Sequence, residues 1–349
     1  MLARVISVGI CGTDREEAAG GRARPPQGAA DLVIGHEMIA QVQQVGASVS
    51  ELAAGDLVVF TVRRGCGTCP ACAADRADMC SSGGYRERGI WGLDGYQSEL
   101  VVDSARNAVR VPPGLRAAGV LTEPLSVAEK AIDEAARIQN ARIPVVEDRA
   151  SWPRERRCLV AGLGPIGLLA AMALRLRGAQ VWGLDVVDAD GARPAWLKAI
   201  GGTYLDARTV AAEAVGESMG GMDLIVEATG VASLELNLLD ALGRNGIYVL
   251  TGIPGGDRPL QVQGAELIRR LVLENQVMVG SVNAAREHFR AAVSDLLLAQ
   301  EKWPGHVERL ITTRRPYGEF LAALSRHEPG EIKVTLEWSS AGPAATALR

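Results

Sequence analysis

The sequence has no excess of basic residues and no long apolar run. Its 37 lysines and arginines are outnumbered by 41 aspartates and glutamates, and the net charge is −4. A mildly acidic chain lacks the positive surface by which nucleic-acid-binding proteins attract phosphates. No segment approaches the ~18 consecutive apolar residues of a membrane span. We therefore expect a protein that binds neither nucleic acid nor a membrane.

Cysteine is also sparse. Six cysteines in 349 residues do not make a disulfide framework. The opening MLARVISVGIC is too short for the apolar part of a secretory signal, so we expect a cytoplasmic protein whose cysteines remain thiols. Hydrophobic residues make up 48% of the chain, which suits a globular protein of about two domains.

The pattern of apolar residues changes near residue 120. Before it, short apolar runs alternate with Gly, Pro and Asp breaks, which predicts a compact β-rich domain. LTEPLSVAEKAIDEAARI then has helical spacing of its apolar residues. Further on, strand-like and helix-like segments alternate from CLVAG to QVMVGS, which predicts a parallel sheet with helices on both faces. The fold class we expect is α/β, with a doubly wound sheet and a second, β-rich domain.

Four of the six cysteines lie within fifteen residues, in the order C-x2-C-x2-C-x7-C. One loop of this kind can wrap a tetrahedral zinc ion with four thiolates. An iron–sulfur cluster is the main alternative, but the C-x3-C-P run that continues ferredoxin motifs is absent. Because four protein ligands close the coordination sphere, we predict a structural zinc. The predicted ligands are Cys66, Cys69, Cys72 and Cys80.

A second set of metal-ligand residue types lies upstream of this loop. It comprises Cys11 in GICGTDRE and the neighbours His36 and Glu37 in GHE. A lone cysteine or histidine is more often a core residue than a ligand, and His36 is the only histidine in the first 287 residues. Together they fit a zinc site of mixed sulfur, imidazole and carboxylate ligands, a type that leaves one position for substrate.

A glycine-rich turn follows the apolar run CLVAG. Gly162, Gly164 and Gly167 form G-x-G-x-x-G directly before the helix-like LLAAMALRLRG. Such glycines allow a tight turn, and the helix N-terminus attracts a pyrophosphate. Asp185 ends the next apolar segment, at the spacing of the acid that binds an adenine-ribose hydroxyl. This carboxylate favours NAD over NADP, although Arg193 keeps NADP open as an alternative.

With these motifs in order, the sequence resembles the zinc-dependent medium-chain dehydrogenases and, among them, the glucose 1-dehydrogenase branch. The resemblance runs from about residue 5 to residue 338. It is carried by GICGTDRE, VIGHE, VRRGCGTCPAC with DMC, GGYRERGIWGLDGY, LTEPLSVAEKAI, GLGPIG, VEATG and VGSVNAAREHF. The glucose branch in particular is indicated by the stretches around Arg88, Glu123 and Asn283.

The resemblance implies roles for individual residues. It places a catalytic zinc on Cys11, His36 and Glu123, with Glu37 able to exchange with water on the metal. Thr13 would pass the substrate proton outward, and Asp14 would orient the imidazole of the zinc-binding histidine. Sugar hydroxyls would contact two further positions and the metal-site glutamate. The implied substrate-binding residues are Glu87, Glu123 and Asn283. The implied cofactor-binding residues are Gly162, Gly164, Pro165, Ile166, Gly167, Asp185, Thr229 and Ser281.

The resemblance also implies a domain plan. A GroES-like catalytic domain would occupy residues 1–136 with the zinc lobe at 65–80, and an NAD(P)-binding Rossmann domain would occupy 137–283. Residues 284–338 would return to the catalytic domain, and 339–349 would form a disordered tail. Only ten residues precede Cys11, whereas the family normally opens with a further pair of strands. We therefore expect an internal start or a truncated chain.

The reaction implied is oxidation of the C1 hydroxyl of an aldose, in carbohydrate metabolism. D-glucose would give glucono-1,5-lactone, with hydride transfer to NAD or NADP and two zinc ions per chain. Polyol and threonine dehydrogenases of the same superfamily are the nearest alternatives. A non-catalytic nucleotide-binding protein lacking the N-terminal strands is the alternative from another class. The partners we expect are a small sugar and a second copy of the chain, in a homodimer or homotetramer.

Overall fold

The computed structural model describes residues 1–143, 151–256, 259–325, 328 and 330–338. The expected disordered tail at 339–349 lies outside them. The chain divides into two compact units. The first comprises 1–123, 284–297 and 307–349, and the second comprises 124–283 and 298–306. The domain boundaries proposed from the sequence remain predictions. No helix among the described residues is long and apolar enough to cross a membrane.

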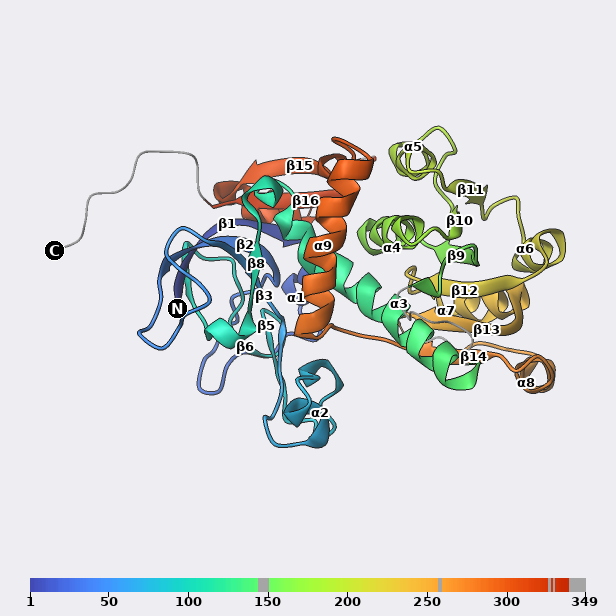
Figure 1. Ribbon diagram of the computed structural model, residues 1–349, viewed down its shortest axis with the longest axis horizontal. Helices are drawn as coiled ribbons and strands as arrows, with labels where there is room; N and C mark the ends of the chain where they lie inside the picture. Colours follow the sequence, from blue (N-terminus) through green and yellow to red (C-terminus); the bar gives the residue numbers. More distant parts are fainter. Residues whose placement is uncertain (144–150, 257–258, 326–327, 329, 339–349) are drawn as a thin grey trace. The chain divides into compact units, whose positions relative to one another are not determined.

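The first unit is built on a seven-stranded sheet. Its path runs β15-β16-β1-β2-β3-β8, with β7 paired to β1 (Figure 1). The strands are β1 (Leu2–Ile10), β2 (Glu37–Gln44), β3 (Leu57–Phe60), β7 (Leu100–Val102), β8 (Ala108–Val111), β15 (Ile311–Pro316) and β16 (Lys333–Glu337). β1 pairs on both sides, antiparallel to β2 and to β16. A continuous apolar core that includes Val5, Val8, Met38 and Phe60 stabilises these strands.

Three short strands form a separate small sheet in this unit, in the order β4-β5-β6. They are β4 (Arg63–Arg64), β5 (Arg86–Arg88) and β6 (Gly92–Leu93). The cysteine lobe lies between β4 and β5 in the sequence. The helices of the unit are α1 (Gly12–Ala18), α2 (Pro70–Ala73) and α10 (Phe320–Ser325). The 3₁₀ helices are Ala77–Met79, Ala105–Asn107, Pro113–Leu115, Gly119–Leu121, Glu308–Leu310 and Tyr317–Glu319.

The second unit contains a six-stranded parallel sheet in the order β11-β10-β9-β12-β13-β14. Its strands are β9 (Arg157–Ala161), β10 (Gln180–Asp185), β11 (Thr203–Asp206), β12 (Met222–Glu227), β13 (Leu242–Leu250) and β14 (Val277–Gly280). Strand order reverses between β9 and β12, which is the doubly wound arrangement expected from the sequence. In such sheets ligands bind at the carboxyl ends of the strands beside this reversal.

Helices connect the parallel strands. They are α4 (Pro165–Leu176), α5 (Ala192–Ala199), α6 (Ala212–Met219), α7 (Ala232–Asn237) with the 3₁₀ helix Leu238–Ala241, and α8 (Gly264–Leu273). Two longer helices, α3 (Thr122–Arg142) and α9 (Arg286–Lys302), each contribute residues to both units. α4 begins with proline at its first position, where the missing N–H costs no hydrogen bond, and residues 167–174 are all buried.

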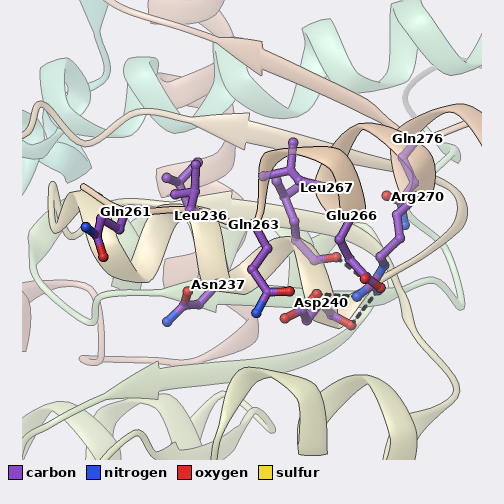
Figure 2. A pocket seen from close by; sticks show the side chains of 11 residues that line it. Leu236, Asn237, Asp240, Gln261, Gln263, Glu266, Leu267, Arg270 and Gln276 are labelled. Carbon is purple, nitrogen blue, oxygen red and sulfur yellow. Dashed lines mark hydrogen bonds and ion pairs between the residues drawn. The ribbon is translucent and has the colours of Figure 1, made fainter. Parts of the chain in front are cut away.

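A cavity of about 530 Å³ lies in the second unit beside α7 and α8 (Figure 2). Its lining is largely polar, and the side chains of Arg270 and Asp240 form an ion pair in it. None of the residues expected to bind the dinucleotide lines this cavity.

Candidate active site and metal centres

The four cysteines of the lobe converge as their spacing predicts. Their sulfur atoms all lie within 4.8 Å of one another. Cys66 Sγ is 3.9 Å from Cys72 Sγ, and Cys69 Sγ is 4.0 Å from Cys80 Sγ. Tetrahedral zinc with Zn–S bonds of about 2.3 Å requires sulfur separations of about 3.8 Å. The residues present therefore fit a structural zinc ion without rearrangement.

Hydrogen bonds in the lobe favour thiolates at two of these positions. Those from Ser82 and then Thr68 lower the pKa of Cys66 to about 5. Backbone hydrogen bonds, first that of Cys72, lower the pKa of Cys69 to about 7. Burial raises the pKa of Cys72 to about 11. Because the metal ligand is the thiolate, a cation would have to displace the Cys72 proton on binding.

Cys11 and His36 also meet. Cys11 directly follows β1 and His36 directly precedes β2, and the antiparallel pairing of Gly9 with Glu37 brings these strand ends together. Cys11 Sγ lies 3.2 Å from His36 Nε2. His36 is 6% exposed, so the imidazole is held in an environment with little water.

Asp14 joins the pair from the first turn of α1. Its Oδ2 accepts a hydrogen bond of 2.8 Å from the Cys11 backbone N–H, and its Oδ1 is 3.6 Å from His36 Nδ1. Burial of His36 lowers its pKa, but the negative charges of Cys11 and Asp14 outweigh this effect and raise the pKa well above the usual value. Asp14 thus lies beside Nδ1 of His36, and its role in orienting the imidazole stays a prediction.

Two glutamates form a second group with His36. One oxygen each of Glu37 and Glu123 and a ring nitrogen of His36 lie within 4.8 Å of one another. Burial, with a smaller contribution from Glu37, raises the pKa of Glu123 to about 7. Burial followed by the charge of Asp14 raises the pKa of the Cys11 thiol. A buried set of thiol, imidazole and carboxylates is the donor chemistry of a catalytic zinc site, so these residues fit that metal.

Glu37 has a partner that sequence reasoning missed. Lys333 of β16 places its Nζ 2.7 Å from both carboxylate oxygens of Glu37, and it also donates to the Ile10 carbonyl at 3.3 Å. Both side chains are buried, with 1% and 3% exposure. A lysine in the apolar run IKVTLEW was the available signal, because a buried lysine requires a paired carboxylate.

The segment that carries Glu87 packs beside His36. Glu87 lies on β5, and the following turn brings Gly89 so close to Gly35 that a Cβ on Gly89 would sit 2.5 Å from the Gly35 carbonyl oxygen. Tyr96 N–H donates to the same carbonyl at 2.9 Å. Thr13 is half-buried on α1, between Cys11 and Asp14 in sequence. Sugar binding by Glu87 and proton transfer by Thr13 stay predictions.

The glycine turn of the second unit has the geometry its motif predicts. Gly162 follows β9 with φ of +87°, a conformation that favours glycine. A Cβ on Gly167 would lie 1.8 Å from the Gly162 carbonyl oxygen, so no other residue fits there. Gly164 caps α4, whose first residues are Pro165 and Ile166. The first turn of this helix presents backbone N–H groups that suit a pyrophosphate.

The remaining cofactor candidates also stand at strand ends. Asp185 ends β10, and its carboxylate accepts hydrogen bonds from Leu163 N–H at 2.6 Å and Val186 N–H at 2.7 Å. Thr229 follows β12 and donates to the Glu227 carboxylate through both its N–H and its hydroxyl. Ser281 follows β14, and Asn283, with φ of +63°, ends the first segment of the unit. The carboxyl edge of the sheet thus carries these candidates.

Arg193 lies near the specificity position. Its Nη1 is 4.0 Å from Asp185 Oδ2. Arg208 is held by Asp188 at 2.9 Å and Asp206 at 2.7 Å. The sequence did not predict Arg208 at this place, because it lies 23 residues after Asp185. The parallel pairing of β10 with β11 sets Asp206, one of its two partners, beside Asp185.

Comparison with known proteins identifies the family. Residues 1–113 match the alcohol dehydrogenase GroES-like domain, and residues 116–338 match the glucose dehydrogenase C-terminus. A glucose 1-dehydrogenase of Vulcanisaeta moutnovskia is 39% identical over 97% of this chain and 91% of its own length. One from Methanocella arvoryzae is 38% identical over 90% of this chain and 85% of its own length.

Solved structures agree with these matches. Glucose dehydrogenase from Haloferax mediterranei, in complex with NADP, Zn and gluconolactone, has a TM-score of 0.86 and 35% identity over 97% of this chain and 92% of that one. Galactitol-1-phosphate dehydrogenase from Escherichia coli, at 23% identity and a TM-score of 0.77, shares the fold. The chain belongs to the glucose dehydrogenase family of the zinc-dependent medium-chain dehydrogenases.

Proposed function

We propose that this protein oxidises the C1 hydroxyl of an aldose, D-glucose first, to the 1,5-lactone with reduction of NAD or NADP. The observation that carries the proposal is that His36 belongs to two groups of potential metal ligands, Cys11–Asp14–His36 and His36–Glu37–Glu123, in a chain 35% identical to a glucose dehydrogenase solved with NADP, Zn and gluconolactone. When bound, zinc supplies Lewis-acid activation of the sugar hydroxyl, lowering its pKa as it lowers that of water.

The chain's own residues perform the remaining tasks. Thr13 passes the hydroxyl proton toward solvent. Asp14 holds the orientation of His36, because a carboxylate facing Nδ1 selects the tautomer that leaves Nε2 as the ligand atom. Glu87 and Asn283 accept hydrogen bonds from sugar hydroxyls and so fix which carbon faces the nicotinamide. Hydride transfer itself belongs to the cofactor, and the protein contributes position and charge.

We propose NAD as the preferred cofactor. The Asp185 carboxylate at the end of β10 suits a ribose 2′-hydroxyl and would repel a 2′-phosphate. Arg193 at 4.0 Å from Asp185 neutralises part of that charge, so NADP is expected to be used with lower efficiency.

Initial rates on D-glucose, D-galactose, D-xylose and sorbitol, each with NAD and with NADP, test both proposals. We expect D-glucose with NAD to give the highest kcat/KM and the product to be a lactone. Faster oxidation of sorbitol than of any aldose would indicate a polyol dehydrogenase instead. Absence of turnover with every substrate, in protein that binds NAD, would leave the non-catalytic alternative.

We further propose a cytoplasmic homo-oligomer. Among the described strands, β14 is the last of its sheet and pairs only with β13, so its outer edge offers backbone groups to a second copy. Four thiolates as zinc ligands suit a compartment that keeps cysteines reduced. Light scattering across a concentration series tests the assembly, and a molar mass of a single chain at all concentrations would contradict it.

A further inference from the structure

Arg63 connects the cysteine lobe to Glu87. Its Nε donates to Glu87 Oε1 at 3.0 Å, and its Nη2 lies 2.9 Å from the same oxygen. Its Nη1 donates to the Asp78 backbone carbonyl at 2.6 Å, and its guanidinium lies over the Tyr85 ring at 4.1 Å. The side chains of Arg63 and Glu87 are 9% and 13% exposed. Water therefore competes little with these charge-assisted bonds.

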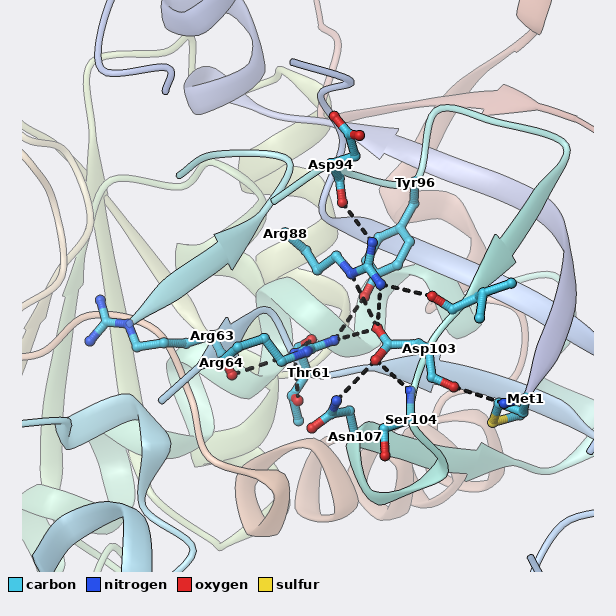
Figure 3. Close-up of polar contacts among 11 residues, drawn as sticks. Met1, Thr61, Arg63, Arg64, Arg88, Asp94, Tyr96, Asp103, Ser104 and Asn107 are labelled. Atoms are coloured by element: carbon cyan, nitrogen blue, oxygen red, sulfur yellow. Dashed lines mark hydrogen bonds and ion pairs between the residues drawn. The ribbon is translucent and has the colours of Figure 1, made fainter. Parts of the chain in front are cut away.

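Arg64 and Arg88, the strand neighbours of Arg63 and Glu87, bind Asp103 instead. Figure 3 shows Arg64 and Arg88 converging on Asp103, which accepts from Arg64 Nη2 at 2.6 Å and from Arg88 Nε at 3.1 Å. Arg63 extends away from that group in the same view. Side chains alternate between the two faces of a strand. On one face, Arg64 of β4 and Arg88 of β5 bind Asp103 and so hold the two strands in place. Arg63 and Glu87, which are directly paired across the strands, project from the other face.

The Asp78 end of the connection depends on the lobe. Asp78 is 2% exposed, and Arg76 binds its two carboxylate oxygens at 3.0 and 2.8 Å. Asp78 lies in the 3₁₀ helix Ala77–Met79, whose C-cap is the metal ligand Cys80. A metal that closes the lobe through Cys80 would therefore act on the position of the Asp78 carbonyl.

The Glu87 end reaches the candidate active site. Ile90 and Trp91 N–H groups both donate to the Glu87 carbonyl, at 3.2 and 2.9 Å, which makes a tight turn. Gly89 in that turn packs on Gly35, the residue before His36. Loss of the Arg63 contact would thus free the Glu87 carboxylate while the backbone turn stays in place.

We propose that Arg63 is a positioning residue that holds the Glu87 carboxylate for sugar binding and makes sugar affinity depend on the metal of the cysteine lobe. This rests on the proposed function, in which Glu87 contacts sugar hydroxyls. The planar guanidinium of Arg63 donates to the Glu87 carboxylate and to the Asp78 carbonyl at the same time. The single ammonium group of a lysine cannot reproduce this geometry.

The kinetic test compares Arg63→Lys with Arg86→Lys in enzyme loaded with zinc. Arg86 lies on β5 next to Glu87 with an exposed side chain, so it is a matched control. We expect Arg63→Lys to raise the KM for D-glucose about tenfold and to change kcat by less than about twofold, because the lost bonds stabilise bound sugar and transition state alike. The control should keep the wild-type KM. An unchanged KM in Arg63→Lys overturns the proposal.

A second measurement uses the wild-type enzyme and requires no turnover. If lobe metal favours sugar binding, sugar must favour metal retention by the same factor. We expect saturating D-glucose to shift the chelator concentration at which the peptide containing Cys66 to Cys80 becomes alkylated, measured by mass spectrometry at equilibrium. The shift should vanish in Arg63→Lys. An absent shift in wild type, or one that persists in Arg63→Lys, overturns the proposal.

The kinetic and alkylation results test the proposed substrate and the proposed role of Arg63 separately. A wild-type enzyme that does not oxidise D-glucose refutes the proposed substrate. The alkylation measurement with the sugar it does oxidise then still decides the role of Arg63. Turnover of D-glucose without metal–sugar coupling refutes the role of Arg63 and leaves the proposed function intact.

Discussion

At the scale of single residues, the cluster around His36 concentrates buried charge. Thiol, imidazole and carboxylate groups from three separate segments meet where few waters reach, and their pKa values shift accordingly. Burial is the largest cause of the raised pKa values of Cys11 and Glu123, whereas the negative charges of Cys11 and Asp14 raise the pKa of His36. Lys333 compensates the buried charge of Glu37, and a divalent cation is a further positive charge that the thiol, imidazole and carboxylate donors suit.

Replacement of the imidazole tests its role in the reaction. His36→Ala should lower kcat/KM for D-glucose by at least about 10³-fold, because a ligand that activates the sugar hydroxyl is lost. NAD affinity should stay within about twofold, since the dinucleotide residues lie on a different sheet. Steady-state kinetics and fluorescence titration of NAD measure the two effects. Wild-type kcat in this variant would refute the proposed role of His36.

The Lys333–Glu37 pair predicts a strong effect on stability. Lys333→Met removes the cation that compensates the buried Glu37 carboxylate, so we expect a loss of about 3–5 kcal/mol in the free energy of unfolding. Urea denaturation of the metal-free protein measures it. The double variant Lys333→Met with Glu37→Gln should recover part of the loss, because no unpaired charge then remains. An additive loss in the double variant would contradict the pairing argument.

Glu17 predicts a pH dependence. Both of its carboxylate oxygens are buried without a hydrogen-bond partner among the described residues, and burial raises its pKa to about 7. A raised folded-state pKa means that the protonated form is favoured on folding. Stability from this group is therefore present below about pH 4.5, its unfolded pKa, and is lost as pH rises through about 7.

Glu17→Gln should remove the loss of stability that ionisation of Glu17 causes as the pH rises. The variant should gain stability relative to wild type between about pH 5 and 8, by about 1 kcal/mol. Glu16→Gln, with an exposed carboxyl on the same helix, is the matched control and should leave the pH profile unchanged. Chemical denaturation at a series of pH values compares the three proteins. A constant difference between wild type and Glu17→Gln across this range would contradict burial as the cause.

At the scale of elements, the cysteine lobe is a metal-closed loop with little core of its own. None of the residues of α2 is buried, so apolar packing contributes little to its stability. Cys72→Ser should therefore remove the lobe zinc, lower Tm by several degrees and leave the second zinc bound. Metal analysis with thermal denaturation tests this. Loss of both ions in a folded variant would contradict two independent sites.

Local motifs were predictable because each element carries its own signal. The C-x2-C-x2-C-x7-C spacing predicted that the four sulfur atoms converge. Gly162 and Gly167 predicted a tight turn, and at Gly167 only glycine fits. Pairings between distant segments were not predictable. Lys333 is 296 residues from Glu37, and Arg63 is 24 residues from Glu87 across the lobe. Such contacts are set by strand order, which the local sequence does not encode.

At the scale of the whole molecule, we expect two chemically distinct zinc ions in one chain. The lobe supplies four sulfur ligands, and the cluster around His36 supplies one sulfur with nitrogen and oxygen. The catalytic role is thus assigned to one zinc ion and the structural role to the other. A measurement of total zinc content alone does not distinguish the two ions.

X-ray absorption at the zinc edge on the fully loaded protein tests this assignment most directly. With about two zinc ions per chain, the two ligand sets average to about 2.5 sulfur ligands per zinc, with light-atom ligands at about 2.0–2.2 Å. About one zinc per chain with four sulfur ligands would contradict the account. Cys11, His36 and Glu123 would then hold no catalytic metal.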